Sequence, residues 1–173
     1  MSDARPPTDD ELVAAARQLG RALVKRRWQM AAAESCTGGL VGHVITQVPR
    51  SSDHFLGGIV SYSDAVKEEL LEVPGTLLDG LGAVSAEVAE AMTAGALDRF
   101  PAAQLAVAVT GIAGPDGGSE EKPVGLTYVA AAVRDGTAVV ERHTWPHDRD
   151  GNKRASALAA LELATRVVSE QPA

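Results

Sequence analysis

A short polar segment, residues 34–39 (ESCTGG), stands between an apolar run at residues 28–33 and a helical pattern at residues 38–47. This order predicts a sharp turn from a strand into a helix, which lifts a side chain above the sheet edge. Glycines there let backbone amides face a ligand without interference from a Cβ atom. We interpret Ser35 as a nucleophile and Thr37, Gly38 and Gly39 as a turn that binds substrate phosphate or a developing oxyanion. The same letters also fit a plain helix cap.

A serine nucleophile needs a base, and Lys67 is a candidate at the start of the next predicted helix, residues 64–71. Lysine accepts a proton only as a neutral amine, so burial has to lower its pKa from about 10.4. Tyr62, at the end of a predicted strand over residues 55–62, is placed to relay or orient the proton. The neighbouring Glu68 and Glu69 equally fit a solvated helix face.

A third segment, residues 110–118 (TGIAGPDGG), follows an apolar strand predicted over residues 104–110. Ligands of open α/β sheets collect beyond the carboxyl ends of the strands, so this loop predicts contacts to phosphate or ribose. We assign substrate binding to Thr110, Gly111, Ala113 and Gly114. The loop matches neither a P-loop nor a dinucleotide fingerprint, and a flexible connector is the alternative.

Basic residues open the last predicted helix, residues 150–168. We interpret Arg149 as a phosphate ligand because guanidinium groups bind phosphate through two parallel hydrogen bonds. Lys153 and Arg154 are alternative phosphate ligands, and all three residues also fit ordinary solvated cations on the protein surface.

Local signals predict the remaining elements. Thr8 and Glu11 form a capping-box pattern that starts a helix after a flexible arm, residues 1–8. A further helix is expected over residues 85–100. Asp135-Gly136 predicts a hairpin joining strands at residues 124–133 and 137–145. The last helix should bury a face containing Leu158, Leu161, Thr165 and Val168. Together these elements predict a single α/β domain over residues 9–170, with three α/β/α layers around a mixed, mostly parallel five-stranded sheet.

Composition narrows the function classes. The net charge of −7, the 3% aromatic content and the absence of a basic run argue against nucleic-acid and membrane partners. No apolar run is long enough for a membrane span, and a single cysteine, Cys36, excludes an internal disulfide. These features predict a cytoplasmic protein. The four histidines lack metal-ligand spacing and are expected as polar surface residues or caps; they are His43, His54, His143 and His147. At this point a histidine base for Ser35, or Cys36 as the nucleophile, stays open.

Taken together, ESCTGG, the Tyr62-x4-Lys67 spacing, TGIAGP at residues 110–115 and EKPVG at residues 121–125 resemble the CinA C-terminal family, also called nicotinamide-nucleotide amidases. The resemblance covers residues 10–168. It implies an anticodon-binding-domain-like α/β/α fold, a homodimer, and no metal or organic cofactor.

The resemblance also implies a reaction. The family's amidases hydrolyse the carboxamide of nicotinamide mononucleotide to nicotinate mononucleotide and ammonia. Ser35 matches their nucleophile, Lys67 their general base and Tyr62 their supporting hydroxyl, while Thr110 and Arg149 match active-site and substrate-binding positions. The alternative is a non-catalytic nucleotide-binding or interaction module of the competence-damage type.

Overall fold

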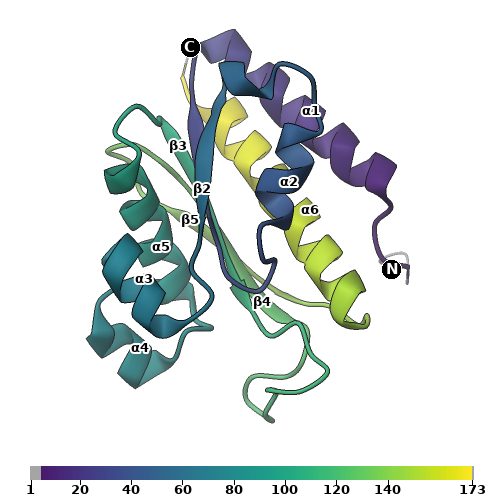
Figure 1. The fold of residues 1–173 in the computed structure, drawn as a ribbon, viewed down its shortest axis with the longest axis vertical. Helices are drawn as coiled ribbons and strands as arrows, with labels where there is room; N and C mark the ends of the chain where they lie inside the picture. Colours follow the sequence, from purple (N-terminus) through teal and green to yellow (C-terminus); the bar gives the residue numbers. More distant parts are fainter. Residues whose placement is uncertain (1–4, 173) are drawn as a thin grey trace.

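The computed structural model describes residues 5–172. Helices and strands alternate along the first two thirds of the chain, and a β-hairpin and a long helix follow (Figure 1). The elements are, in order, α1 (Asp9–Arg26), β1 (Met30–Glu34), α2 (Leu40–Thr46), the 3-10 helix η1 (Ser51–Asp53), β2 (Phe55–Val60), α3 (Asp64–Leu71), α4 (Gly75–Leu81), α5 (Ala86–Arg99), β3 (Leu105–Gly111), β4 (Leu126–Val133), β5 (Val139–Thr144) and α6 (Arg149–Glu170).

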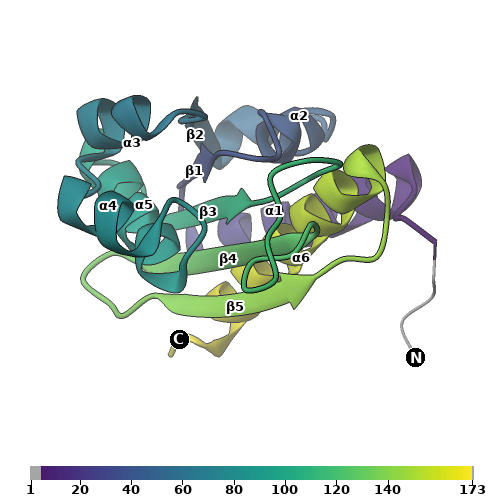
Figure 2. The same cartoon turned by 90° about the horizontal axis from the view of Figure 1, so that it is seen from below.

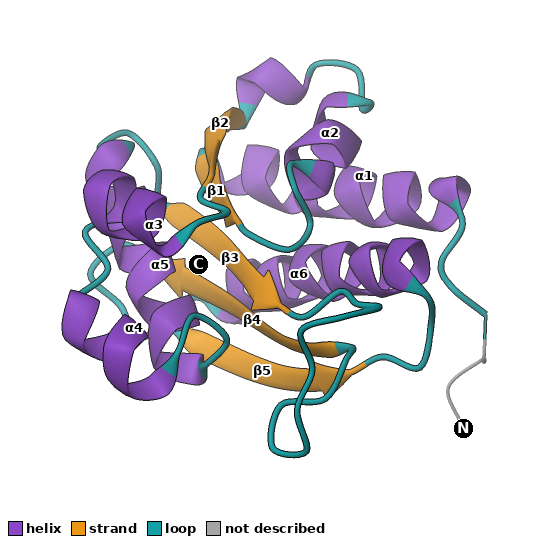
Figure 3. Ribbon diagram, turned by 60° about the horizontal axis from the view of Figure 1, so that its bottom comes forward, coloured by secondary structure: helices purple, strands orange, loops and turns teal. Residues whose placement is uncertain are grey.

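The five strands form one mixed sheet in the order β2-β1-β3-β4-β5. Strands β1, β2 and β3 are parallel, β4 is antiparallel to β3, and β5 is antiparallel to β4, so four strands point the same way. The predicted mixed, mostly parallel sheet is confirmed. Because β1, β2 and β3 are parallel, the turns after their last residues lie at one edge of the sheet (Figure 3).

Helices cover both faces of the sheet and complete the three predicted layers. Helices α1, α2 and α6 share one hydrophobic core with the sheet, and α3, α4 and α5 share the other. Figures 1 and 2 show the two groups on opposite sides of the strands. Strands β1 and β3 lie between the two cores and are therefore buried almost throughout, which explains their continuous Ala and Val runs.

Two local signals produced the predicted structures. The Thr8 side chain caps α1 while the Glu11 carboxylate accepts from the Thr8 amide, which is a complete capping box. The β4–β5 hairpin turns at Asp135, whose φ of 63° lies in the left-handed region that Asp tolerates. Across residues 5–172, no helix has both the length and the apolar character that crossing a bilayer requires.

The structure corrects several details. Helix α4 was not predicted, because its seven residues have neither a capping side chain nor a sustained apolar period. Residues 5–8 of the expected arm are mostly exposed but make two polar contacts: Arg154 donates to the Pro7 carbonyl, and Arg5 pairs with Glu11. Residues 1–4 of that arm lie outside the described range.

The buried surface of α6 is wider than the predicted stripe. The helix lies between the sheet and α1, so Ala157, Ala160 and Ala164 are buried as well as Leu161 and Val168.

His54 is also corrected. It is 4% exposed rather than on the surface, and its ring packs against Gly20, which has no side chain to displace it.

Candidate active site

A cavity of about 260 Å³ opens at the sheet edge where β1, β2 and β3 end. Eight of the eleven predicted site residues line it, although they come from four separate segments of the chain. They are Ser35, Tyr62, Lys67, Thr110, Gly111, Ala113, Gly114 and Arg149. The volume is slightly below the roughly 300 Å³ at which small-molecule pockets begin, so the cavity fits a small ligand or one part of a nucleotide.

Lys67 is the most unusual member of this cavity. Its side chain is 1% exposed, and its Nζ lies 3.3 Å from Ser35 Oγ, 2.9 Å from the Ser61 carbonyl and 3.3 Å from the Tyr62 carbonyl. Burial lowers the pKa of this amine, and the exposed Asp64 carboxylate, 3.8 Å away, opposes that shift. A protonated amine donates to all three oxygens. In the neutral amine the two carbonyls accept both hydrogens, and the lone pair is left for the Ser35 hydroxyl.

Ser35 is held by backbone bonds on both sides. Its amide donates to the Val109 carbonyl of β3 at 2.9 Å, and its own carbonyl accepts from the Gly38 amide at 3.0 Å. The next residue, Cys36, is 6% exposed, and burial raises the pKa of its thiol to about 12. A thiol with that pKa carries almost no thiolate near neutral pH. The geometry therefore favours the serine over the cysteine as nucleophile.

The turn after Ser35 is organised around the carboxylate of Glu34. Within residues 5–172, Thr37, Gly38 and Gly39 are not among the residues that line the cavity, and their assignment to substrate binding stays a prediction. The buried carboxylate of Glu34 draws the Thr37 hydroxyl and the Gly39 amide toward itself. Within residues 5–172, Ser35 and Cys36 are the residues of this segment that line the cavity. The Ser35 amide donates to the Val109 carbonyl, whereas the Cys36 amide donates to no oxygen of the described residues.

Tyr62 and Arg149 close one side of the cavity. Arg149 donates through Nη2 to the Tyr62 hydroxyl at 3.2 Å and through Nη1 to the Gly114 carbonyl at 2.5 Å. The Tyr62 side chain is 62% exposed, and it is its backbone carbonyl that meets Lys67. The Tyr62 hydroxyl therefore lies beside the Arg149 guanidinium, and Lys67 contacts Ser35 directly.

The loop between β3 and β4, which Figure 3 shows beyond the end of β3, also lines the cavity. Its glycines are required by the backbone conformation and close packing of the loop. A Cβ on Gly111 would lie 2.7 Å from the Leu126 carbonyl oxygen, and Gly114 has a φ of 85° with Val124 close by. The Thr110 hydroxyl donates to the Ala83 carbonyl at 2.8 Å. The loop therefore contributes shape and backbone groups to the cavity.

The three cations near the start of α6 have different surroundings. Arg154 bonds the Pro7 carbonyl and the Asp9 carboxylate, away from the cavity. Lys153 has its Nζ 3.8 Å from the position of a Cβ on Gly38, beside the nucleophile turn. Arg149 is the one of the three that lines the cavity. The histidines are not part of it either, so a histidine base for Ser35 finds no support.

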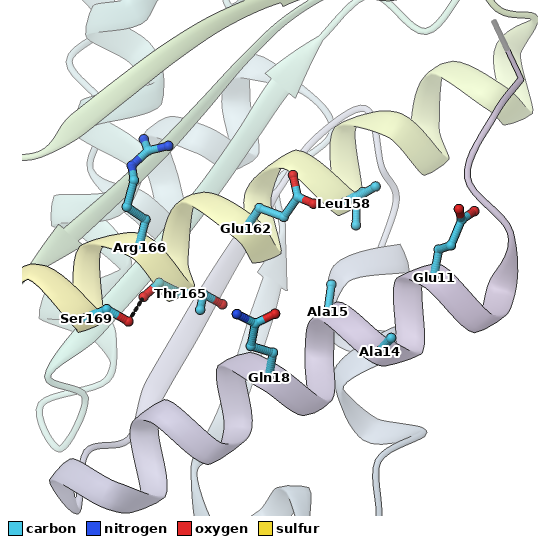
Figure 4. Close-up of a pocket in the computed structure, with 9 residues that line it drawn as sticks. All are labelled: Glu11, Ala14, Ala15, Gln18, Leu158, Glu162, Thr165, Arg166 and Ser169. Carbon is cyan, nitrogen blue, oxygen red and sulfur yellow. Dashed lines mark hydrogen bonds between the residues drawn. The ribbon is translucent and has the colours of Figure 1, made fainter. Parts of the chain in front are cut away.

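A larger hollow of about 580 Å³ lies between α1 and α6, and Figure 4 shows its lining. Its two α6 hydroxyls, Thr165 and Ser169, donate to carbonyls one turn back on their own helix at 2.8 and 2.7 Å. Arg166 pairs with Glu141 of β5. No lysine lines this hollow. Among residues 5–172, no group of three His, Cys, Asp or Glu side chains is arranged to hold a metal ion.

Sequence reasoning missed two residues that shape the site. The sequence motif assigns no role to Glu34. Its position five residues before the N-cap Gly39 is the signal that its carboxylate can cap helix α2. Asn152 of α6 is 1% exposed; it donates to the Ala113 carbonyl at 3.0 Å and accepts from the His147 amide at 3.1 Å. Nothing in its local sequence signals that contact, since its partner is 39 residues away.

Known proteins resemble this chain in amino-acid sequence. A family model of the CinA C-terminal domain matches residues 13–168. A CinA-like protein from Mycobacterium marinum is 47% identical over 161 residues, which are 93% of this chain and 36% of the relative. Another, from Desulfotalea psychrophila, is 45% identical over 86% of this chain and 35% of its own length. The chain thus spans about a third of the length of these curated relatives.

Solved structures agree with the sequence relatives. The competence/damage inducible protein CihA from Agrobacterium tumefaciens is 35% identical with a TM-score of 0.87, covering 98% of this chain and 100% of that chain. The competence damage-inducible protein ComA from Klebsiella pneumoniae is 28% identical with a TM-score of 0.88, covering 93% and 99%. Sequence motifs, sheet order and these matches agree, and the chain belongs to the CinA C-terminal domain family.

Proposed function

We propose that this protein is an amidase that hydrolyses the carboxamide of nicotinamide mononucleotide, with Ser35 as nucleophile and Lys67 as general base. The observation that carries the proposal is the contact between a fully buried lysine amine and a serine hydroxyl, 3.3 Å apart, in a cavity at the sheet edge. Burial lowers the pKa of this amine despite the Asp64 carboxylate 3.8 Å away, and it thus favours the neutral amine that a base requires.

The proposed reaction begins with transfer of the Ser35 proton to Lys67 Nζ while Ser35 Oγ attacks the carboxamide carbon. The Cys36 amide is the backbone donor offered to the developing oxyanion. Collapse of the tetrahedral intermediate breaks the C–N bond, and Lys67 returns the proton to the leaving nitrogen, which departs as ammonia. Water then attacks the acyl carbon and gives a proton to Lys67. The C–O bond to Ser35 breaks, Lys67 returns that proton to Ser35 Oγ, and the carboxylic acid leaves.

Arg149 is the proposed ligand of the nucleotide phosphate, because among Arg149, Lys153 and Arg154 it is the residue that lines the cavity. Lys153 is a second cation beside the nucleophile turn and adds positive charge on that side. Tyr62 supports this part of the site, since its hydroxyl accepts a hydrogen bond from Arg149. A metal or organic cofactor has no part in this proposal.

The test is to incubate the purified protein with nicotinamide mononucleotide and to measure ammonia and nicotinate mononucleotide together. Ser35→Ala should reduce the release of both by at least about 100-fold. Cys36→Ala is the matched control, since it shortens the adjacent cavity-lining side chain and should keep most of the activity. Full turnover in Ser35→Ala would refute the nucleophile. Stabilisation of the wild-type protein by the nucleotide without product would instead indicate a binding module.

A further inference from the structure

The carboxylate of Glu34 satisfies four hydrogen-bond donors of the turn that follows it. Its Oε2 accepts from the Thr37 hydroxyl at 2.6 Å, the Gly39 amide at 3.0 Å and the Val41 amide at 3.1 Å, and its Oε1 accepts from the Gly42 amide at 2.9 Å. The residue is 3% exposed, and within residues 5–172 no cation forms a salt bridge with it. A buried carboxylate is tolerated here because the turn and the first amides of α2 solvate it.

These bonds replace a missing cap. The N-cap residue of α2 is Gly39, which has no side chain to accept from the helix amides. The carboxylate supplies that acceptor from the last residue of β1, one position before the nucleophile. Strand and helix are therefore tied together across the turn that holds Ser35.

The backbone of Glu34 is connected to the base as well. Its carbonyl accepts from the Ser61 amide at 2.7 Å, and the Ser61 carbonyl accepts from Lys67 Nζ at 2.9 Å. The side chain thus fixes the turn that carries Ser35, while the main chain is linked to the support of Lys67.

We infer that Glu34 is a positioning residue whose carboxylate holds Ser35 Oγ within reach of Lys67 Nζ. This inference rests on the proposed function. Replacing the carboxylate by an amide of the same shape brings an NH2 group to at least one backbone or hydroxyl donor, so part of the turn loses its acceptor. A displacement of about 1 Å at a reacting group costs up to roughly 100-fold in rate.

The test compares Glu34→Gln with Glu69→Gln, which removes the same charge from an exposed position on α3. One readout is the rate at which a sulfonyl fluoride modifies Ser35, located by peptide mass spectrometry, and this readout is independent of nicotinamide mononucleotide. The other is kcat and KM for that nucleotide. Glu34→Gln should lower the labelling rate and kcat by about 10- to 100-fold with KM within about threefold, while Glu69→Gln matches the wild type.

A smaller perturbation keeps the test decisive if Glu34→Gln does not fold. Thr37→Val removes one of the four donors and preserves the shape of the side chain, so both rates should fall in the same direction by a few-fold. Wild-type labelling and kcat in every folded variant would overturn the inference, as would a wild-type Ser35 that the reagent does not modify. Labelling that depends on Glu34 without any nucleotide turnover would support the positioning role and refute the proposed substrate.

Discussion

Asp64 offers the sharpest test of Lys67 as a base. Its carboxylate lies 3.8 Å from Lys67 Nζ, is 56% exposed, and raises the pKa of the amine against the larger effect of burial. Asp64→Asn should therefore lower that pKa, so that more of the amine is neutral at any pH below it. At this separation, with water around the carboxylate, the interaction is worth about 1 kcal/mol. We expect roughly fivefold higher kcat/KM at the acid end of the profile.

The assay is ammonia release from nicotinamide mononucleotide, measured as kcat/KM across pH at low ionic strength. The rate should rise with pH as Lys67 loses its proton and level off above its pKa, where Asp64→Asn and wild type should coincide. Glu69→Gln is the control, because it removes a charge from the same helix without a contact to the amine. In about 1 M salt the screening length is near 3 Å, and the difference should shrink. A shift toward higher pH, or none at low salt, would refute the assignment of the base.

The remaining predictions concern separate contacts. Lys67→Arg should lower kcat by about 10²- to 10⁴-fold, because a guanidinium keeps its proton; activity near wild type in a rate assay would contradict a proton-accepting role. Alkylating reagents should leave wild-type turnover unchanged at pH 7 to 8, since burial raises the pKa of the Cys36 thiol to about 12, and rapid inactivation that is lost in Cys36→Ala would count against this. Asn152→Leu should cost about 1–3 kcal/mol in urea unfolding, because the Ala113 carbonyl loses its donor, and it should raise KM; unchanged values of both would exclude a role in holding the loop. His54 has no partner for either ring nitrogen within residues 5–172, and burial lowers its pKa. The unfolded chain then binds the extra proton first, so stability should fall as the pH drops below about 6.5, and His54→Phe should flatten that dependence in unfolding titrations at pH 5 and pH 8.

Much of the fold followed from local chemistry. The capping box at Thr8 and Glu11 and the left-handed Asp135 form because residues a few positions apart satisfy one another. The apolar runs of β1 and β3 were recognisable in the sequence because both strands are buried between the two cores. Parallel strands ending at one edge then brought Ser35, Tyr62 and Thr110 together, as expected. Where local signals were weak, as in α4, the prediction failed, because short helices depend on packing for their stability.

The family and the meeting of Ser35 with Lys67 at one sheet edge thus followed from the sequence, since motif order and strand ends determine which residues meet. Tertiary structure decided the direction of the pKa shift of Lys67 and which groups the polar atoms of the turn contact. Lys67 has a lowered pKa because the surrounding protein excludes water from it, and Lys67 next to Glu68 and Glu69 gave no sign of that burial. The amides of the turn face Glu34 rather than the cavity because a buried carboxylate must be solvated by the nearest donors. The burial of Lys67 depends on residues distant in the chain, such as Ser35, which is 32 positions away, and no spacing rule encodes it. The Glu34 contacts span only three to eight positions, but the burial that forces them comes from the packing of β1 against α2.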